Sequence, residues 1–147
     1  MISQTAEYAL RAIVYLADQQ AARTTAQIAE ATKVPAGYLA KVMQSLSRAG
    51  LVRSQRGLNG GFTLARSAEE VSILAVVNSV DPIHRYPECP LGIASHGRSL
   101  CPLHHRLDQA AAMVEKAFGD TMVAELLAGP RERKPLCRFP TEAKVLR

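Results

Sequence analysis

The stretch "TTAQIAEATKVPAGYLAKVMQSLSRAG", residues 24–50, decides the fold of this chain. Thr24 can cap a helix, and Gln27 three residues later completes a capping box, so a helix is predicted to begin here. Pro35 breaks the pattern and suits the first position of a second helix, because its missing N–H would have no partner there. That second helix carries an apolar stripe at helical spacing and ends at Gly50, a residue that favours a left-handed cap. The stripe consists of Leu39, Val42, Met43 and Leu46.

Two helices separated by a short turn follow the helix-turn-helix plan. The inward face of the second helix is taken up by its apolar stripe. Its outward and N-terminal face carries small, hydrogen-bonding and cationic side chains, which a helix needs if it enters the major groove of DNA. From this face we predict DNA contacts by Ala36, Gly37, Tyr38, Lys41 and Gln44.

A predicted β-hairpin follows directly, in "LVRSQRGLNGGFTLAR", residues 51–66. Its centre, from Asn59 through Gly60 to Gly61, supplies residues that tolerate positive φ. Arg53 and Arg56 stand on the approach to this turn. A cationic hairpin after a helix-turn-helix forms a wing, whose arginines can reach phosphates or a narrow minor groove. We therefore add Arg53, Arg56, Asn59 and Gly60 to the predicted DNA contacts.

The composition fits a single basic domain. The chain has 147 residues, 48% of them hydrophobic, and a net charge of +5, which favours an anionic partner. No apolar run is long enough to cross a membrane. The N-terminal stretch is interrupted by Glu7, Arg11 and Asp18, so it reads as an amphipathic helix and not as a signal peptide. We expect a cytoplasmic protein, in which cysteines serve as metal ligands, reactive thiols or core residues before they form disulfides.

The remaining sequence completes a mainly α fold. Ser72 can cap a helix over residues 73–80, a proline- and glycine-rich loop follows, and helical periodicity returns over residues 102–118. Asp120 is a candidate cap for a last short helix. We predict a winged helix-turn-helix with a small β-hairpin wing and a long C-terminal dimerisation helix. The predicted division is 1–80 winged-helix DNA-binding domain, 81–101 cofactor or sensor loop, 102–128 dimerisation helices and 129–147 polar tail.

The apolar stripe of the long helix has two interpretations. It can pack on the first helix of the same chain, or it can pair with a second copy across a two-fold axis. A symmetric dimer reads the two halves of a palindromic site about one helical turn apart. We favour the homodimer on a palindromic operator of double-stranded DNA.

The loop "ECPLGIASHGRSLCPLHHRLDQ", residues 88–109, holds two of the three cysteines and three of the four histidines. Thiolates and imidazoles are ligands of iron–sulfur clusters and other metals. The stretch has other interpretations: thiols and histidines without a role, or a thiol near a helix start that responds to oxidation without metal. His96 and His105 are further candidates for ligation in this loop, and Cys137 lies in the tail, apart from it.

The order of these segments resembles a known family. "EYALRAIVYLA", "IAEATKVPAGYLAKVMQSLSRAGLVRSQRGLNGGFTLAR", "VVNSVD" and the cysteine loop follow one another as in the winged-helix repressors that include the iron–sulfur regulator IscR and the nitric-oxide sensor NsrR. The resemblance covers about residues 1–128, and "AGLVRSQRG" and "GGFTLAR" are its most specific parts. It implies a homodimeric transcription regulator, and many such proteins carry an iron–sulfur cluster in the loop before the long helix.

The resemblance also implies a set of ligands. Cluster-bearing relatives have three evenly spaced loop cysteines; Cys89 and Cys101 match the outer two, and Ser95 stands at the midpoint. His104 matches the histidine ligand of IscR-like members, and Glu7 in "EYAL" matches the acidic ligand of some NsrR-like members. These four ligands suffice for a [2Fe–2S] cluster, with Glu7 offered by either subunit. Ser95 argues against a three-thiolate [4Fe–4S] cluster, and a chain without any cluster stays an alternative.

The leading hypothesis is a sequence-specific transcription regulator, a repressor, whose operator affinity depends on a cluster or on thiols in the Cys89–Cys101 loop. The alternative is a cofactor-free regulator of the same fold, switched by thiol oxidation or by a partner. A third class is a small zinc or redox enzyme that uses Cys89, Cys101 and His104. Because the sequence holds no nucleophile elbow, no phosphate loop and no general base with a plausible partner, we expect no enzyme.

Overall fold

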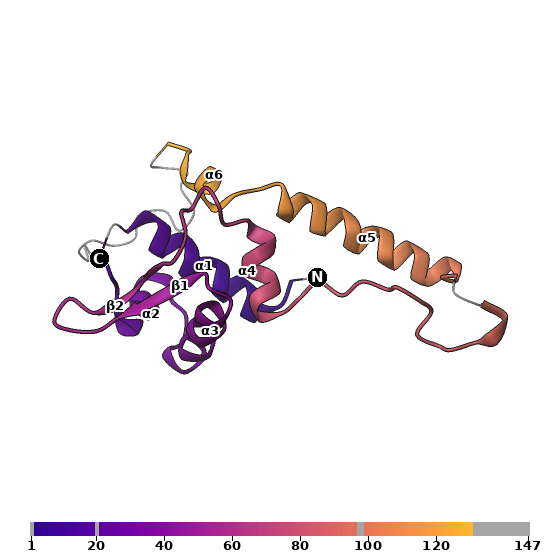
Figure 1. Cartoon of the computed structure of the whole chain (residues 1–147), viewed down its shortest axis with the longest axis horizontal. Coiled ribbons are helices and arrows are strands. Elements are labelled where there is room, and N and C mark those ends of the chain that lie inside the picture. Colours follow the sequence, from indigo (N-terminus) through magenta and orange to yellow (C-terminus); the bar gives the residue numbers. More distant parts are fainter. Residues whose placement is uncertain (1, 20, 97–98, 131–147) are drawn as a thin grey trace, which may run out of the picture.

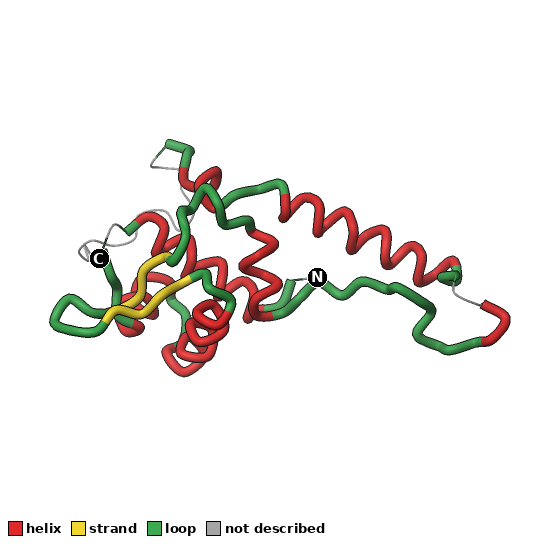
Figure 2. Tube along the Cα trace, in the orientation of Figure 1, coloured by secondary structure: helices red, strands yellow, loops and turns green. Residues whose placement is uncertain are grey.

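A computed structural model of the chain describes residues 2–19, 21–96 and 99–130. It is mainly helical with one two-stranded antiparallel sheet, which confirms the predicted fold class (Figures 1 and 2). A compact winged domain stands at one end, and a long helix extends from it as an arm (Figure 1). The elements are α1 (Gln4–Asp18), α2 (Thr25–Thr32), α3 (Ala36–Arg48), β1 (Val52–Gln55), β2 (Gly61–Leu64), α4 (Ile73–Val80), the 3₁₀ turn η1 (Ala94–His96), α5 (Pro102–Gly119) and α6 (Val123–Leu127).

The helix-turn-helix is formed by α2 and α3. The Gln27 N–H donates to Thr24 Oγ1 at 3.2 Å and the Thr24 N–H donates to Gln27 Oε1 at 2.9 Å, which confirms the capping box. The prediction that Pro35 is the first residue of the second helix was wrong by one position. Pro35 is the N-cap, because its carbonyl already accepts from the N–H groups of Tyr38 and Leu39. Gly50 adopts a φ of +71°, in the left-handed region expected at the helix end.

The core is built around α1, which packs against α2, α3, α4 and α6. Burial of large aliphatic side chains supplies most of the stability of such a domain, about 1.5–3 kcal/mol for each one. The predicted apolar stripe of α3 faces this core and is fully buried. The largest buried side chains are those of Ile13, Ile28, Leu39, Val42, Met43, Leu46, Val71, Val76 and Val123.

The wing is the β1–β2 hairpin, in which Val52 pairs with Leu64 at one end and Gln55 with Gly61 at the other. Gly61 has a φ of +141°, whereas Asn59 and Gly60 do not adopt positive φ. Gly57 does, at +111°, and the turn is closed by the Gly60 N–H donating to the Gly57 carbonyl at 2.9 Å. The glycine-rich turn is therefore present, but its left-handed positions differ from the expected ones.

Arg23, which precedes α2, adds a further pair of backbone hydrogen bonds to the wing. The Arg23 N–H donates to the Phe62 carbonyl at 3.0 Å, and the Phe62 N–H donates to the Arg23 carbonyl at 2.7 Å. At Gly61 a Cβ atom would overlap the carbonyl group of Arg23 and lie 2.9 Å from the Thr24 nitrogen. Glycine at this position therefore lets the wing approach the start of α2.

The arm consists of α5, and none of its residues is buried. Three of its large apolar side chains are open to solvent: Leu103 is 63%, Leu107 43% and Met113 68% exposed. The segment after α4 runs outward from the winged domain, alongside this helix (Figure 1). None of the helices in the described parts of the chain is both long enough and apolar enough to cross a membrane.

After the arm the chain returns to the winged domain. The Val123 N–H donates to the Val71 carbonyl at 2.8 Å, and Val123 is fully buried. The prediction that Asp120 caps the last helix was wrong: α6 begins after Met122, whose N–H donates to the Glu125 carboxylate at 2.9 Å. Asp120 instead ends α5 and pairs with Lys116 at 2.6 Å.

Candidate functional site

The outward face of α3 is open at its N-terminal half. All five positions predicted to contact DNA on this helix are exposed, and the opposite stripe is buried. The Tyr38 ring is 60% exposed and meets the Tyr8 ring edge-on, with centroids 6.3 Å apart. The five exposed residues are Ala36, Gly37, Tyr38, Lys41 and Gln44.

The wing carries the other four predicted contacts. Arg53, Arg56 and Asn59 are exposed, and Gly60 is half-buried. Arg53 donates from Nε to Thr63 Oγ1 on the opposite strand at 3.3 Å, so its guanidinium is held on the face of the hairpin. The structure thus places the nine predicted DNA-contact residues on two neighbouring elements, α3 and the wing.

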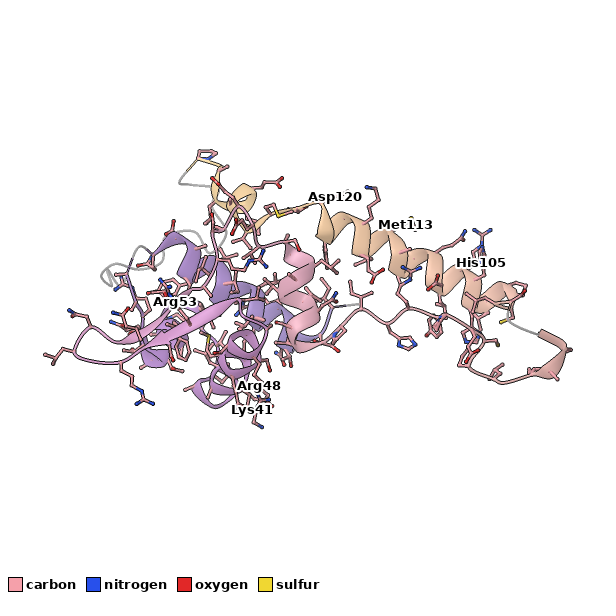
Figure 3. All side chains as sticks on the ribbon, in the orientation of Figure 1. Lys41, Arg48, Arg53, His105, Met113 and Asp120 are labelled. Atoms are coloured by element: carbon pink, nitrogen blue, oxygen red, sulfur yellow. The ribbon has the colours of Figure 1, made fainter. Side chains whose placement is uncertain are left out.

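A hollow of about 490 Å³ lies between α3 and the wing, with Ser54 and Phe62 on the wing side. Lys41 and Arg48 line it, and both extend from the same side of α3 (Figure 3). Arg48 was not among the predicted contacts. The sequence does carry a signal for it, because Lys41, Gln44 and Arg48 are three and four residues apart and share one helix face.

Three of the four predicted ligands come together at the start of α5. Cys101 is the N-cap of the helix, His104 lies in its first turn, and Cys89 arrives from the segment that runs along the helix. His104 Nδ1 lies 3.1 Å from Cys101 Sγ and 3.8 Å from Cys89 Sγ, and the three atoms all lie within 4.8 Å of one another. Cys89 is buried and Cys101 is half-buried. We call these three residues the thiol–imidazole group.

The other candidates lie elsewhere. Glu7 is on α1, outside the group, where its carboxylate pairs with Arg11 Nε at 2.6 Å. His105 is exposed on α5 (Figure 3), and His96 ends the 3₁₀ turn. Cys137 lies outside the described residues.

An aromatic side chain that the sequence analysis missed supports the imidazole. The Tyr86 ring packs against the His104 ring with centroids 5.1 Å apart, and the His84 ring meets Tyr86 edge-on at 4.6 Å. These contacts favour one orientation of His104, with Nδ1 toward the two sulfur atoms. No spacing in the sequence links Tyr86 to His104, because the contact joins a loop to a helix.

An exposed recognition helix, an adjoining cationic wing and a core centred on α1 define a winged-helix DNA-binding protein. The sequence profile of the Rrf2 family, described as an iron-dependent transcriptional regulator, matches residues 2–129. The chain therefore belongs to the Rrf2 family of transcriptional regulators, and its activity is DNA-binding regulation and not catalysis.

Two sequence relatives carry matching names. The chain is 30% identical over 131 residues to a protein of Aquifex aeolicus named as an HTH-type transcriptional regulator. The aligned region covers 86% of this chain and 91% of the relative. It is 32% identical over 132 residues to an rrf2-like HTH-type regulator of Rhodobacter capsulatus, with 86% and 85% covered.

Solved structures agree on the fold. The structure of Staphylococcus aureus CymR is similar with a TM-score of 0.68 and 27% identity, over 87% of this chain and 98% of that one. The structure of T. potens IscR has a TM-score of 0.72 over 86% and 85% of the two chains, and its 20% identity supports the fold alone. Rrf2 regulators bind DNA and are typically dimers.

Proposed function

We propose that this regulator is a homodimeric, cytoplasmic repressor of a palindromic operator, and that the state of the thiol–imidazole group sets its affinity for DNA. The observation that carries the proposal is the convergence of Cys89, Cys101 and His104 within 4.8 Å at the start of the arm helix. Two thiols and an imidazole at this spacing are suited to hold a metal centre or to react with each other.

The exposed arm supports the dimer. Leu103, Leu107 and Met113 are 63%, 43% and 68% exposed along α5, and each large apolar side chain left in water forgoes about 1.5–3 kcal/mol. Pairing α5 with its counterpart across a two-fold axis covers these side chains. The same axis relates two α3 helices, so each reads one half of a palindrome.

The donors fit a [2Fe–2S] cluster better than a [4Fe–4S] cluster. Thiolate sulfur is the usual ligand of both, and imidazole replaces thiolate on one iron in some [2Fe–2S] centres. This chain offers three donors from its own group, and Ser95 stands where a third thiol would be needed. We assign the fourth ligand to Glu7 of the partner subunit, because this chain's own Glu7 lies outside the group. Such a cluster, when bound, supplies sensitivity to oxidants and to iron supply.

The chain's own residues link this group to the DNA-binding surface. Cys89 ends a segment that begins at the C-terminus of α4, and Cys101 begins α5. Holding the two sulfur atoms together therefore ties this segment to the arm. Because α4 packs against both α1 and α3, a change in this tie alters the position of the arm relative to the recognition helix.

The test is anaerobic purification followed by iron and sulfide analysis, visible spectroscopy and operator binding. We expect iron and sulfide in equal amounts in the wild type and in a Cys137→Ser control. Cys89→Ala and Cys101→Ala are expected to lose the visible absorption and to change operator affinity in the same direction as removal of the cluster by a chelator. Persistent absorption in either variant would contradict the assignment of ligands.

A cofactor-free thiol switch is the second candidate, and the contact of 3.1 Å between Cys101 Sγ and His104 Nδ1 favours it. His104 can accept the Cys101 proton as the sulfur attacks hydrogen peroxide. Two thiols and one peroxide then give a Cys89–Cys101 disulfide and two waters. This candidate predicts metal-free protein that binds the operator, loses affinity with peroxide and regains it with dithiothreitol. Protein that responds only to an added partner would reject both candidates.

A further inference from the structure

Arg85 joins the segment after α4 to the arm. Its Nε and Nη2 donate to the two oxygens of Asp108 at 2.7 and 2.8 Å, and its Nη1 donates to Glu115 Oε2 at 2.6 Å. The N–H of Tyr86 adds a bond to Asp108 Oδ1 at 2.9 Å. The other two ion pairs found among the described residues join positions four apart on one helix, so they hold no separate segments together.

The geometry of this contact is stronger than that of an ordinary surface ion pair. Single exposed pairs contribute little, but a guanidinium that meets a carboxylate with two parallel bonds is fixed in direction as well as in distance. The hydrogen bond from Arg85, followed by that from the Tyr86 backbone, holds the pKa of Asp108 well below its usual value. Asp108 and Glu115 raise the pKa of Arg85 in turn, first through their hydrogen bonds. The pair of Arg85 and Asp108 thus remains charged throughout the neutral range.

The position of the contact sets the register between the segment and the helix. Asp108 lies four residues after His104 on α5, so the two share one face of the helix. On the segment, Cys89 lies four residues after Arg85, a distance that an extended chain spans in at most about 14 Å. Cys101 lies seven residues before Asp108 on the helix, about 10 Å along its axis. With Arg85 fixed at Asp108, four residues are enough to bring Cys89 level with the start of α5, and they limit how far along the helix Cys89 can lie.

We propose that Arg85 is a positioning residue for the thiol–imidazole group: its bonds to Asp108 and Glu115 fix the register that brings Cys89 to Cys101 and His104. A slip by one residue moves Cys89 by about 3.3 Å, whereas ligand distances in a metal centre are fixed within about 0.2 Å. The importance of Arg85 for a cluster rests on the proposed function, but its effect on the distance between the sulfur atoms does not.

The first test uses metal-free protein and a Cys137→Ser background, so that only two thiols react. The protein is equilibrated with glutathione and glutathione disulfide; each Cys89–Cys101 disulfide formed consumes one glutathione disulfide and releases two glutathione molecules. Mass spectrometry then gives the equilibrium constant, which measures how closely the two thiols are held. We expect Arg85→Gln to lower this constant at least tenfold. Arg85→Lys keeps the charge but cannot make two parallel bonds to Asp108, so its constant should lie between those of the parent and of Arg85→Gln.

Two controls separate this effect from a general loss of structure. Lys116→Gln removes an ion pair within α5 and is expected to leave the constant within twofold of the parent, with circular dichroism unchanged in all variants. Asp108→Asn removes the two parallel bonds from Arg85 and leaves the bond from Arg85 to Glu115, so it must lower the constant in the same direction as Arg85→Gln, and the double variant must be no worse than Arg85→Gln alone. An Arg85→Gln constant within twofold of the parent, or additive effects in the double variant, would overturn the proposal.

The second test uses the cluster-loaded protein. We expect a chelator to remove iron from Arg85→Gln at least tenfold faster than from the wild type or from Lys116→Gln. Equal rates of iron loss would overturn the role of Arg85 at a cluster. A wild type that takes up no iron and sulfide would reject the cluster in the proposed function, while the disulfide equilibrium still decides on Arg85.

Discussion

Replacing Gly61 by alanine is the sharpest test of how the wing is attached to the domain. Two independent effects act at this residue. Its φ of +141° is a conformation that residues with a Cβ rarely adopt, and forcing one into it costs about 2 kcal/mol. The new Cβ also meets the backbone of Arg23, which must move away. That movement breaks the two hydrogen bonds between Arg23 and Phe62, each contributing about 1 kcal/mol.

The expected loss for Gly61→Ala is therefore about 4 kcal/mol in the free energy of unfolding. Two other glycines provide matched controls. Gly57 has a φ of +111° but open space around its Cα, so Gly57→Ala should lose only about 2 kcal/mol. Gly37 lies in α3 with ordinary φ and open space, so Gly37→Ala should gain about 0.5–1 kcal/mol from helix propensity.

The assay is urea unfolding of the reduced, metal-free protein, followed by circular dichroism at one fixed protein concentration because a dimer is expected. The free energy of unfolding should decrease in the order Gly37→Ala, Gly57→Ala, Gly61→Ala, and its slope against urea concentration should be the same in all three variants. A Gly61→Ala protein within about 1 kcal/mol of Gly57→Ala would refute the reasoning, since it would mean that contact with Arg23 has no energetic consequence.

Three further predictions concern the DNA surface, a helix cap and the arm. Lys41→Ala and Arg48→Ala should each weaken operator binding and make the slope of log affinity against log salt shallower by about 1, measured by fluorescence anisotropy; an unchanged slope would remove that residue from the phosphate contacts. Thr24→Ala breaks the capping box and should cost about 1 kcal/mol in thermal unfolding, whereas Thr24→Ser should be nearly neutral. Asp108 has a lowered pKa, so its stabilising effect is complete above its ordinary pKa of about 4 and is lost as the pH falls through the lowered value. The difference in unfolding free energy between wild type and Asp108→Asn should therefore shrink on acidification below about pH 4, and a constant difference would contradict this.

The helix-turn-helix was predictable because its signals are local. The capping box at Thr24 and Gln27 lies within one turn, and the buried stripe of α3 follows from helical spacing alone. The turn of the wing was less predictable, because Gly61 takes its positive φ where the wing meets Arg23, a residue that pairs with Phe62 only in the folded chain. In the same way, Asp120 has the chemistry of a cap, but its contact with Lys116 and the position of Glu125 place the last helix differently.

The thiol–imidazole group was predictable in part. Cys101 and His104 are three residues apart at a helix start, so local geometry alone brings them together. Cys89 was assigned through resemblance, and its approach depends on the contact between Arg85 and Asp108, which no periodicity reveals. The exposure of α5 could not be inferred either, because an apolar stripe has the same sequence pattern whether it packs on its own domain or on a second copy.

The attachment of α5 at both of its ends has a mechanical consequence. Its C-terminal end continues into the strand-like pairing of Val123 with Val71, and its N-terminal half is joined through Asp108 to Arg85, in the segment after α4. The helix of 18 residues is about 27 Å long. A rotation of the arm by about 6° about its attached C-terminal end displaces its far end by nearly 3 Å (~27 Å × 0.1 radian). In a two-fold assembly the same rotation occurs in both copies, so a change at the sulfur-bearing end of the arm alters the spacing between the two recognition helices.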